Sequence, residues 1–192
     1  IYNVVASASI CIALGMDSNL IFKSLGYLKP ARGRMEVLSE TKNNALVIID
    51  YAHSPDALIS ALKSIQEITN RGRIITLFGC GGDRDKDKRQ IMGKLADEYS
   101  DIVIVTDDNP RNETPSIIRK EILIGCPTAT EIPNRDKAIK YAISNLQKND
   151  LLLIAGKGHE TFQAIGVETL PFDDYTVAKE AIKNFENSEV IN

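Results

Sequence analysis

The segment with the most groups able to bind a ligand is Thr-Asp-Asp-Asn-Pro-Arg-Asn-Glu-Thr-Pro, at residues 106–115. It follows a short apolar run at residues 102–105 and precedes a stretch with helical character. We therefore expect it at the carboxyl end of a strand, where open α/β sheets bind their ligands.

The residue types in this loop suit a ligand that carries both signs of charge. Asp107, Asp108 and Asn109 offer acceptor oxygens. Pro110 stiffens the turn, and the planar fork of donors on Arg111 matches a carboxylate. An amino acid is such a ligand. Taken alone, the loop could equally be a solvated turn that caps a helix.

Three more polar loops follow apolar runs in the same way. One contains Asp50 and His53, which would either lie at the ligand-binding edge or act as local caps. The second, at residues 79–89, is rich in glycine, which allows close approach of the backbone, and precedes a helix start able to hold an anion. Its charged run after Gly82 is otherwise expected to be a solvated helix start. The third loop spans residues 155–160.

The glycine patterns do not match two common nucleotide motifs. A dinucleotide fingerprint would need a third glycine where Arg84 stands, so a nicotinamide-dependent oxidoreductase is a weak alternative. The spacing Gly-x-x-x-x-Gly-Lys-Ser/Thr of a phosphate-binding loop occurs nowhere in the sequence. Polar loops gathered at one sheet edge favour a small-molecule site for carboxylate and amino groups, or for phosphate.

Composition limits the classes of partner. The sequence of 192 residues, 43% of them hydrophobic, can bury a sizeable core without disulfides or metals. A net charge of -3 argues against nucleic-acid and anionic-membrane partners, and no apolar run is long enough to span a bilayer. Cys11, Cys80 and Cys126 are widely spaced, which predicts reduced thiols in a cytoplasmic protein.

Short β-branched runs alternate with amphipathic helical patterns from about residue 45 onward. Expected strands lie at residues 45–50, 73–78, 102–106 and 151–155. Expected helices lie near residues 54–72, 91–99, 114–125, 134–146 and 175–185. The alternation predicts a Rossmann-like, doubly wound α/β fold with a mostly parallel sheet. A hairpin or an antiparallel edge strand is expected between residues 162 and 172.

The first thirty residues have a different pattern, with two helices expected at residues 4–14 and 18–25 and a linker at residues 29–33. The sequence starts with Ile inside a helix-like stretch. We therefore expect the chain to be a piece of a longer protein.

Five motifs together resemble one family. They are Gly33-Arg34-Met35-Glu36, Asp50-Tyr51-Ala52-His53, Gly79 to Asp85, Asp108-Asn109-Pro110-Arg111 and Gly156-Lys157-Gly158-His159-Glu160. In order and spacing they resemble the C-terminal domain of the Mur ligases, in the branch that adds meso-diaminopimelate. The resemblance implies that residues 1–30 end a central ATPase domain and that residues 31–192 form the amino-acid-binding domain.

The resemblance also implies a reaction for the full-length protein. It would be an ATP-dependent ligase that converts the D-Glu carboxylate of UDP-MurNAc-L-Ala-D-Glu into an acyl phosphate, which the amine of diaminopimelate attacks. ATP and Mg²⁺ would be bound mainly by the central domain, with no metal ligand in this chain. The chain alone would be inactive, and the parent would be monomeric, with small molecules as its only partners.

By the same resemblance, the diaminopimelate pocket would consist of Arg84, Asp108, Asn109, Pro110, Arg111, Gly156 and Glu160. The arginines would pair with carboxylates, and Asp108 and Glu160 would hold an ammonium group.

Arg34, Asp50 and His53 would be catalytic and lie near the nucleotide, with Arg34 stabilising phosphoryl charge. Asn3 would lie beside adenine, although the asparagine usual three residues later is Ala6 here.

Smaller assignments and alternatives complete these expectations. Cys80 is expected to pack, His159 to orient its loop, and Lys157 either to meet a phosphate or to face solvent. Two alternatives stay open: the same ligase with another diamino acid, such as lysine or lanthionine, and a non-catalytic amino-acid-binding module.

Overall fold

The computed structural model describes residues 2–41, 43–68 and 72–188, and the chain divides into two compact units, Ile1–Ala31 and Arg32–Asn192. The first unit contains helices α1 (Tyr2–Ala13) and α2 (Ser18–Leu25), both predicted from the sequence. The Asp17 side chain caps α2 by accepting the backbone N–H of Leu20 at 2.9 Å. Within the described ranges, no helix is both long and apolar enough to cross a membrane.

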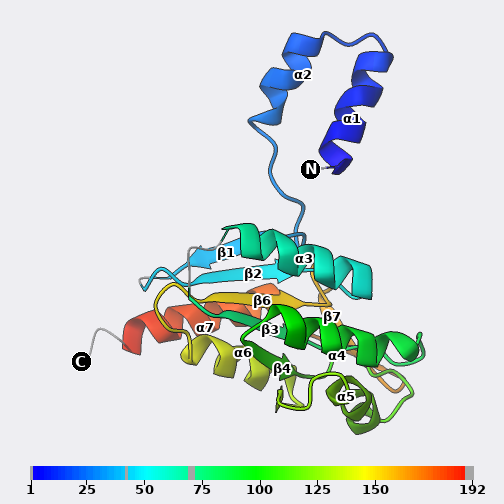
Figure 1. The fold of residues 1–192 in the computed structure, drawn as a ribbon, viewed down its shortest axis with the longest axis vertical. Helices are drawn as coiled ribbons and strands as arrows, with labels where there is room; N and C mark the ends of the chain where they lie inside the picture. Colours follow the sequence, from blue (N-terminus) through cyan, green and yellow to red (C-terminus); the bar gives the residue numbers. More distant parts are fainter. Residues whose placement is uncertain (1, 42, 69–71, 189–192) are drawn as a thin grey trace. The chain divides into compact units, whose positions relative to one another are not determined.

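The second unit is built on a six-stranded sheet, counted over the described residues, with the order β1-β2-β6-β3-β4-β5 (Figure 1). Its strands are β1 (Glu36–Glu40), β2 (Leu46–Asp50), β3 (Ile74–Phe78), β4 (Ile102–Val105), β5 (Thr130–Glu131) and β6 (Leu151–Ala155). Strand β1 is antiparallel to β2, and the other neighbours are parallel. The predicted doubly wound, mostly parallel sheet with an antiparallel edge strand is confirmed.

The antiparallel edge strand and the predicted hairpin are different elements. Residues 162–172 form a separate hairpin, β7 (Phe162–Ile165) and β8 (Glu168–Pro171), while β1 occupies the edge of the main sheet. Strand β1 reads Glu-Val-Leu-Ser-Glu, which contains too few apolar residues to stand out from a linker. Its pairing with β2 is therefore a tertiary effect that the local pattern does not predict.

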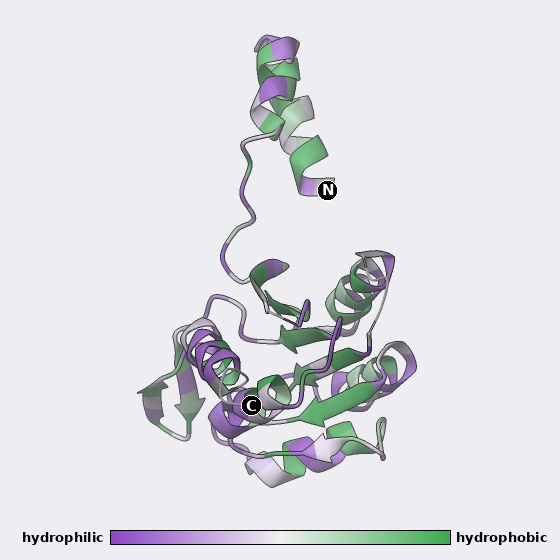
Figure 2. Ribbon diagram, turned by 90° about the vertical axis from the view of Figure 1, so that its left-hand side faces the viewer, coloured by the Kyte–Doolittle hydropathy of each residue, from purple (hydrophilic) through white to green (hydrophobic). Residues whose placement is uncertain are grey.

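Helices cover both faces of the sheet (Figure 1). Helices α3 (Pro55–Ile68), α4 (Asp87–Tyr99) and α5 (Pro115–Leu123) pack on one face, and α6 (Arg135–Ser144) and α7 (Asp174–Ser188) on the other. The strands between them are largely hydrophobic (Figure 2), as expected for parallel strands buried on both sides.

Alternate residues of β2, β3, β4 and β6 enter two separate cores. In β2, Ile48 packs with α3, whereas Val47 and Ile49 pack with α6 and α7. Full burial of such a side chain stabilises the fold by about 1.5–3 kcal/mol relative to exposure. Because β2, β3, β4 and β6 are parallel, their carboxyl ends meet at one edge of the sheet, and their following loops meet there too.

A buried ion pair connects the starts of α6 and α7 to the carboxyl end of β6. The guanidinium of Arg135, at the start of α6, donates from Nε and Nη2 to the two carboxylate oxygens of Asp174, at the start of α7, both at 2.7 Å. Its Nη2 also donates to the carbonyl oxygen of Ala155, the last residue of β6, at 2.9 Å. Both charged side chains are fully buried, so the pair fixes the two helix starts against the end of a central strand.

Replacing Asp174 with alanine is expected to lower the free energy of unfolding by about 3–5 kcal/mol, because it leaves the Arg135 charge buried without its partner. Urea titration followed by circular dichroism would measure this. The matched control is Asp136→Ala, which breaks the exposed pair with Lys140 and should leave the free energy of unfolding close to that of the wild type. Equal losses in the two variants would contradict a structural role for the buried pair.

Candidate functional site

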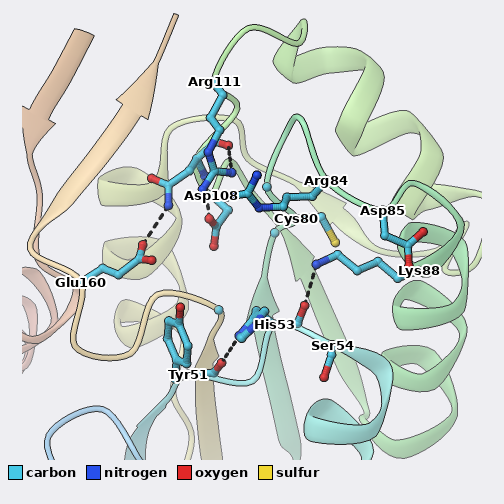
Figure 3. Close-up of a pocket in the computed structure, with 14 residues that line it drawn as sticks. Tyr51, His53, Ser54, Cys80, Arg84, Asp85, Lys88, Asp108, Arg111 and Glu160 are labelled. Atoms are coloured by element: carbon cyan, nitrogen blue, oxygen red, sulfur yellow. Dashed lines mark hydrogen bonds between the residues drawn. The ribbon is translucent and has the colours of Figure 1, made fainter. Parts of the chain in front are cut away.

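A cavity of about 430 Å³ opens at the carboxyl edge of the sheet (Figure 3). Its walls come from the loops that follow β2, β3, β4 and β6. The expected site residues in these walls are His53, Arg84, Asp108, Asn109, Arg111, Gly156 and Glu160. Turns that lie far apart in the sequence thus meet around one space, as the strand-end pattern predicts.

The loop after β4 is held by the hairpin. The backbone N–H of Arg111 donates to the carbonyl oxygen of Ala164 in β7 at 3.0 Å, and the N–H of Gly166 donates to the carbonyl oxygen of Arg111 at 2.6 Å. Arg111 has a φ of 51°, in the left-handed region that a residue with a side chain seldom adopts. The pairing with β7 therefore holds a strained backbone in place.

Positive and negative groups both line the cavity. Nη1 of Arg111 donates to the carbonyl oxygen of Gly82 at 2.9 Å, which fixes the guanidinium beside the glycine-rich loop. Arg84 reaches the cavity from that same loop (Figure 3). The carboxylates of Asp108 and Glu160 also lie in the wall. This arrangement suits a ligand with both an anionic and a cationic group.

Asp108 is the most deeply buried acid of the cavity wall. Its Oδ1 accepts the backbone N–H of Asn109 at 2.6 Å. Burial raises the pKa of Asp108, while the charges of Arg135 and Lys157 act in the opposite direction. A cation bound in the cavity would stabilise the charged carboxylate further.

Glu160 is fixed through one of its two carboxylate oxygens. Its Oε2 accepts Nδ2 of Asn109 at 2.8 Å and Nζ of Lys157 at 3.0 Å. The Lys157 side chain is fully buried, so the expectation that it could face solvent is wrong. Lys157 lies two residues after the end of β6, in a stretch, residues 151–158, that is buried throughout.

Two glycines allow chain segments to approach closely behind the cavity. At Gly156, with a φ of 113°, a Cβ atom would lie 2.7 Å from Oδ2 of Asp108. At Gly82, a Cβ atom would lie 1.9 Å from the carbonyl oxygen of Pro110. Pro110 is buried beneath the glycine-rich loop and is not part of the cavity wall, so it supports the pocket from outside.

Arg34 and Asp50 do not line the cavity. The guanidinium of Arg34 lies over the ring of Tyr51, 4.7 Å from its centroid, and Oδ2 of Asp50 accepts the backbone N–H of Met35 at 2.7 Å. Burial raises the pKa of Asp50. Asn3 belongs to the first unit, where it lines a groove between α1 and α2.

Some cavity residues were not predicted from the sequence. Tyr51, Ser54, Asp85 and Lys88 join the wall, and Nζ of Lys88 donates to the carbonyl oxygen of His53 at 2.7 Å. Polar residues of this kind at the start of a helix are common on any surface. Only the folded structure, which brings these residues together in one cavity wall, distinguishes them from ordinary surface residues.

Two expectations about charged residues need correction. The run after Gly82 is not wholly solvated, because Arg89 is fully buried and binds Glu113 and Glu121. Arg89, Met92 and Ala96 are spaced three and four residues apart, so they lie on the same face of α4. That spacing in the sequence already indicates that Arg89 faces the interior.

Asp107 does not contribute an acceptor to the cavity wall. Its carboxylate binds Arg119 of α5.

Cys80 is buried as expected, with its Sγ 3.8 Å from Sδ of Met92. Burial raises the pKa of the Cys80 thiol to about 12, so it stays protonated.

The fold and the cavity define a class: an α/β domain with a cavity of small-molecule size at the carboxyl edge of a mostly parallel sheet. The family model for "Mur ligase, glutamate ligase domain" matches residues 33–158, and the chain belongs to this family.

Individual proteins similar to this chain share one name. A protein of Agrobacterium fabrum named UDP-N-acetylmuramoyl-L-alanyl-D-glutamate--2,6-diaminopimelate ligase is 47% identical over 188 residues, which cover 98% of this chain and 38% of that protein. A protein of Zymomonas mobilis with the same name is 49% identical over 184 residues, with 94% and 38% covered. A solved structure of a ligase of this name has 36% identity and a TM-score of 0.73, covering 95% of this chain and 38% of its own. The chain thus spans less than two fifths of the length of these relatives.

Replacing Gly156 with alanine is expected to destabilise the protein more than Gly166→Ala, as measured by urea unfolding. Both glycines have positive φ, so each substitution carries a backbone cost of about 1–2 kcal/mol. Only the Gly156 variant adds a contact with Asp108, since nothing lies within 4 Å of a Cβ at Gly166. Equal losses would show that the close approach to Asp108 has no energetic weight.

Proposed function

We propose that this chain is the C-terminal, amino-acid-binding domain of an ATP-dependent ligase that adds meso-diaminopimelate to UDP-MurNAc-L-Ala-D-Glu in peptidoglycan synthesis. The observation that carries the proposal is the cavity in which Arg84 and Arg111 lie with Asp108 and Glu160. The names of the similar proteins support the same substrate. In this proposal, residues 1–30 end the central ATPase domain and residues 31–192 form the amino-acid-binding domain.

The charges of the cavity match the chemistry of diaminopimelate. Each end of this amino acid carries one carboxylate and one ammonium group. The guanidinium groups of Arg84 and Arg111 would bind carboxylate, and Asp108 and Glu160 would bind the ammonium of the end that does not react. Lysine has only a primary ammonium at that end, so it would leave the arginine side of the cavity without a partner.

The domain would contribute position rather than covalent chemistry. In the proposed reaction, ATP phosphorylates the D-Glu carboxylate, the free amine of diaminopimelate attacks the acyl phosphate, and phosphate leaves as the amide forms. Holding the amine in line with the acyl carbon converts a bimolecular step into an intramolecular one, which is worth up to about 7–11 kcal/mol.

ATP and Mg²⁺ would be held mainly by the rest of the ligase. Among the residues that the structure describes, no group of three or more His, Cys, Asp or Glu side chains could hold a metal ion. Arg34, Asp50 and His53 are proposed to lie near the nucleotide, and Asn3 near its adenine. In this chain Arg34 rests on Tyr51, which would direct its guanidinium until phosphate is present.

The first test is substrate choice by the full-length protein, measured as ATP-dependent addition to UDP-MurNAc-L-Ala-D-Glu. Diaminopimelate is expected to be the preferred amino acid, and kcat/KM for lysine is expected to be at least about 100-fold lower, because the carboxylate-binding arginines stay unpaired. Lanthionine, which has the same groups at both ends, should be intermediate. Preference for lysine would overturn the proposed substrate, and turnover by the isolated chain would overturn the proposed division of labour.

The second test is the pH dependence of diaminopimelate binding to the full-length protein, measured by calorimetry. Because the pKa of Asp108 is raised, its carboxylate is charged above that raised pKa and gains a proton as the pH falls through it. Affinity should therefore be lost on acidification at a higher pH than for an ordinary aspartate. Asp108→Asn should weaken binding roughly tenfold to hundredfold at pH 8 and reduce the pH dependence, whereas the exposed-site control Asp136→Asn should change neither. An unchanged pH profile in Asp108→Asn would exclude Asp108 as the titrating group.

A further inference from the structure

Lys157 is a buried cation immediately behind the ligand cavity. Its side chain has no solvent exposure and is not part of the cavity wall. Placing an ammonium group away from water is costly unless acceptors and opposite charges surround it. The partners of Lys157 therefore indicate why a lysine is present at this position.

Those partners are two residues that do line the cavity. Nζ of Lys157 donates to Oε2 of Glu160 and to Oδ1 of Asn109, each at 3.0 Å. Nδ2 of Asn109 donates to the same Oε2 at 2.8 Å, which closes a three-residue cycle of hydrogen bonds. Oδ1 of Asn109 also accepts the backbone N–H of Ala164 at 2.9 Å, so the amide group has one orientation that satisfies all its partners.

The cycle determines how Glu160 faces the cavity. Both hydrogen bonds reach Oε2, which holds the carboxylate plane and directs Oε1 away from this cycle. In Figure 3 the dashed line from the carboxylate of Glu160 marks its hydrogen bond with Asn109. Without Lys157, Glu160 would keep one of these two bonds and gain freedom to rotate.

Lys157, Glu160 and Asp108 form a charged group that we call the cavity floor, and Lys157 changes its net charge. The acids near it are Glu160 and Asp108, and the further ion pair of Arg135 with Asp174 is neutral as a unit. The Phe162 ring lies 5.5 Å from Nζ and adds no charge. With its acids ionised, the group carries one net negative charge, which one bound ammonium balances. Removal of Lys157 would leave two negative charges.

We propose that Lys157 is a positioning residue that determines specificity. It holds Glu160 and Asn109 in place and cancels one of the two carboxylate charges, so that the cavity accepts an amino acid end with a carboxylate and an ammonium rather than an ammonium alone. The inference rests on the proposed function and names a residue that acts on the substrate only through its neighbours.

The test is Lys157→Met in the full-length ligase, since methionine approximates the length of the lysine chain without its charge. KM for diaminopimelate is expected to rise roughly tenfold to hundredfold, from loss of a charge-assisted hydrogen bond and added repulsion of the carboxylate, while KM for ATP changes less than about twofold. The ratio of kcat/KM for diaminopimelate to that for lysine is expected to fall about tenfold or more. A role in stability alone would lower activity with both amino acids alike and leave that ratio unchanged.

A double variant separates charge from packing. Lys157→Met combined with Glu160→Gln has the same net charge in the cavity floor as the wild type, because it removes one positive and one negative charge. Its preference for diaminopimelate over lysine should recover relative to Lys157→Met, because the lost ammonium contact affects both substrates. Lys140→Met, on the exposed surface of α6, is the control for loss of a lysine and should match the wild type.

The outcomes distinguish the inference from the function on which it rests. If the wild-type protein fails to add diaminopimelate, the proposed function is wrong. If the wild type adds it and Lys157→Met keeps the substrate ratio within about twofold, the role of Lys157 is wrong and the function stands. If Lys157→Met does not fold, the double variant is the test. A wild-type ratio of kcat/KM for diaminopimelate to that for lysine supports the proposed role of the Lys157 charge, and a ratio reduced about tenfold overturns it.

Discussion

The cavity depends on the side chain of Asn109, which connects the loop after β4 to residues 157–164, 48 to 55 residues further along the chain. Its oxygen accepts hydrogen bonds from Lys157 and from the backbone of Ala164, and its nitrogen donates to Glu160. A carboxylate at this position could not donate to Glu160, and an apolar residue would leave the buried Lys157 short of an acceptor. Asparagine is the residue type that provides both a donor and an acceptor there.

The buried charges serve the fold and the site at the same time. Arg135 joins the starts of α6 and α7 to the end of β6, and its charge also opposes the rise that burial causes in the pKa of Asp108. Stability requires that each buried charge has a partner of opposite charge. A binding site for an ion requires a charge without such a partner in the protein. Among Lys157, Glu160 and Asp108, the lysine compensates one of the two carboxylate charges, and the other leaves a place for a cation from solution.

Much of the architecture follows from local sequence pattern, and the exceptions have physical causes. The parallel strands β2, β3, β4 and β6 were predicted because continuous apolar runs such as 151–155 identify strands buried on both faces, whereas the short, exposed β5 was not. The edge strand β1 gave little signal, because half of such a strand faces solvent. Arg89 could have been assigned to the buried face of α4 from its spacing with Met92, but its acid partners come from other segments. The polar loops were predicted to meet at one sheet edge, whereas the bonds from β7 to the loop after β4 arise from tertiary pairing alone.

The hairpin holds Arg111 through main-chain groups, and these are identical in every residue except proline. The outward side chains of β7 and β8 are therefore not constrained by that task. Val167, at the turn between them, is almost completely exposed. Exposed side chains of the hairpin can change without altering these main-chain bonds, whereas Gln163 of β7 donates from Nε2 to the carbonyl oxygen of Asp108 at 2.6 Å and is tied to the loop by its side chain. Substitution of an exposed hairpin residue such as Val167 is thereby uncoupled from the geometry of the pocket.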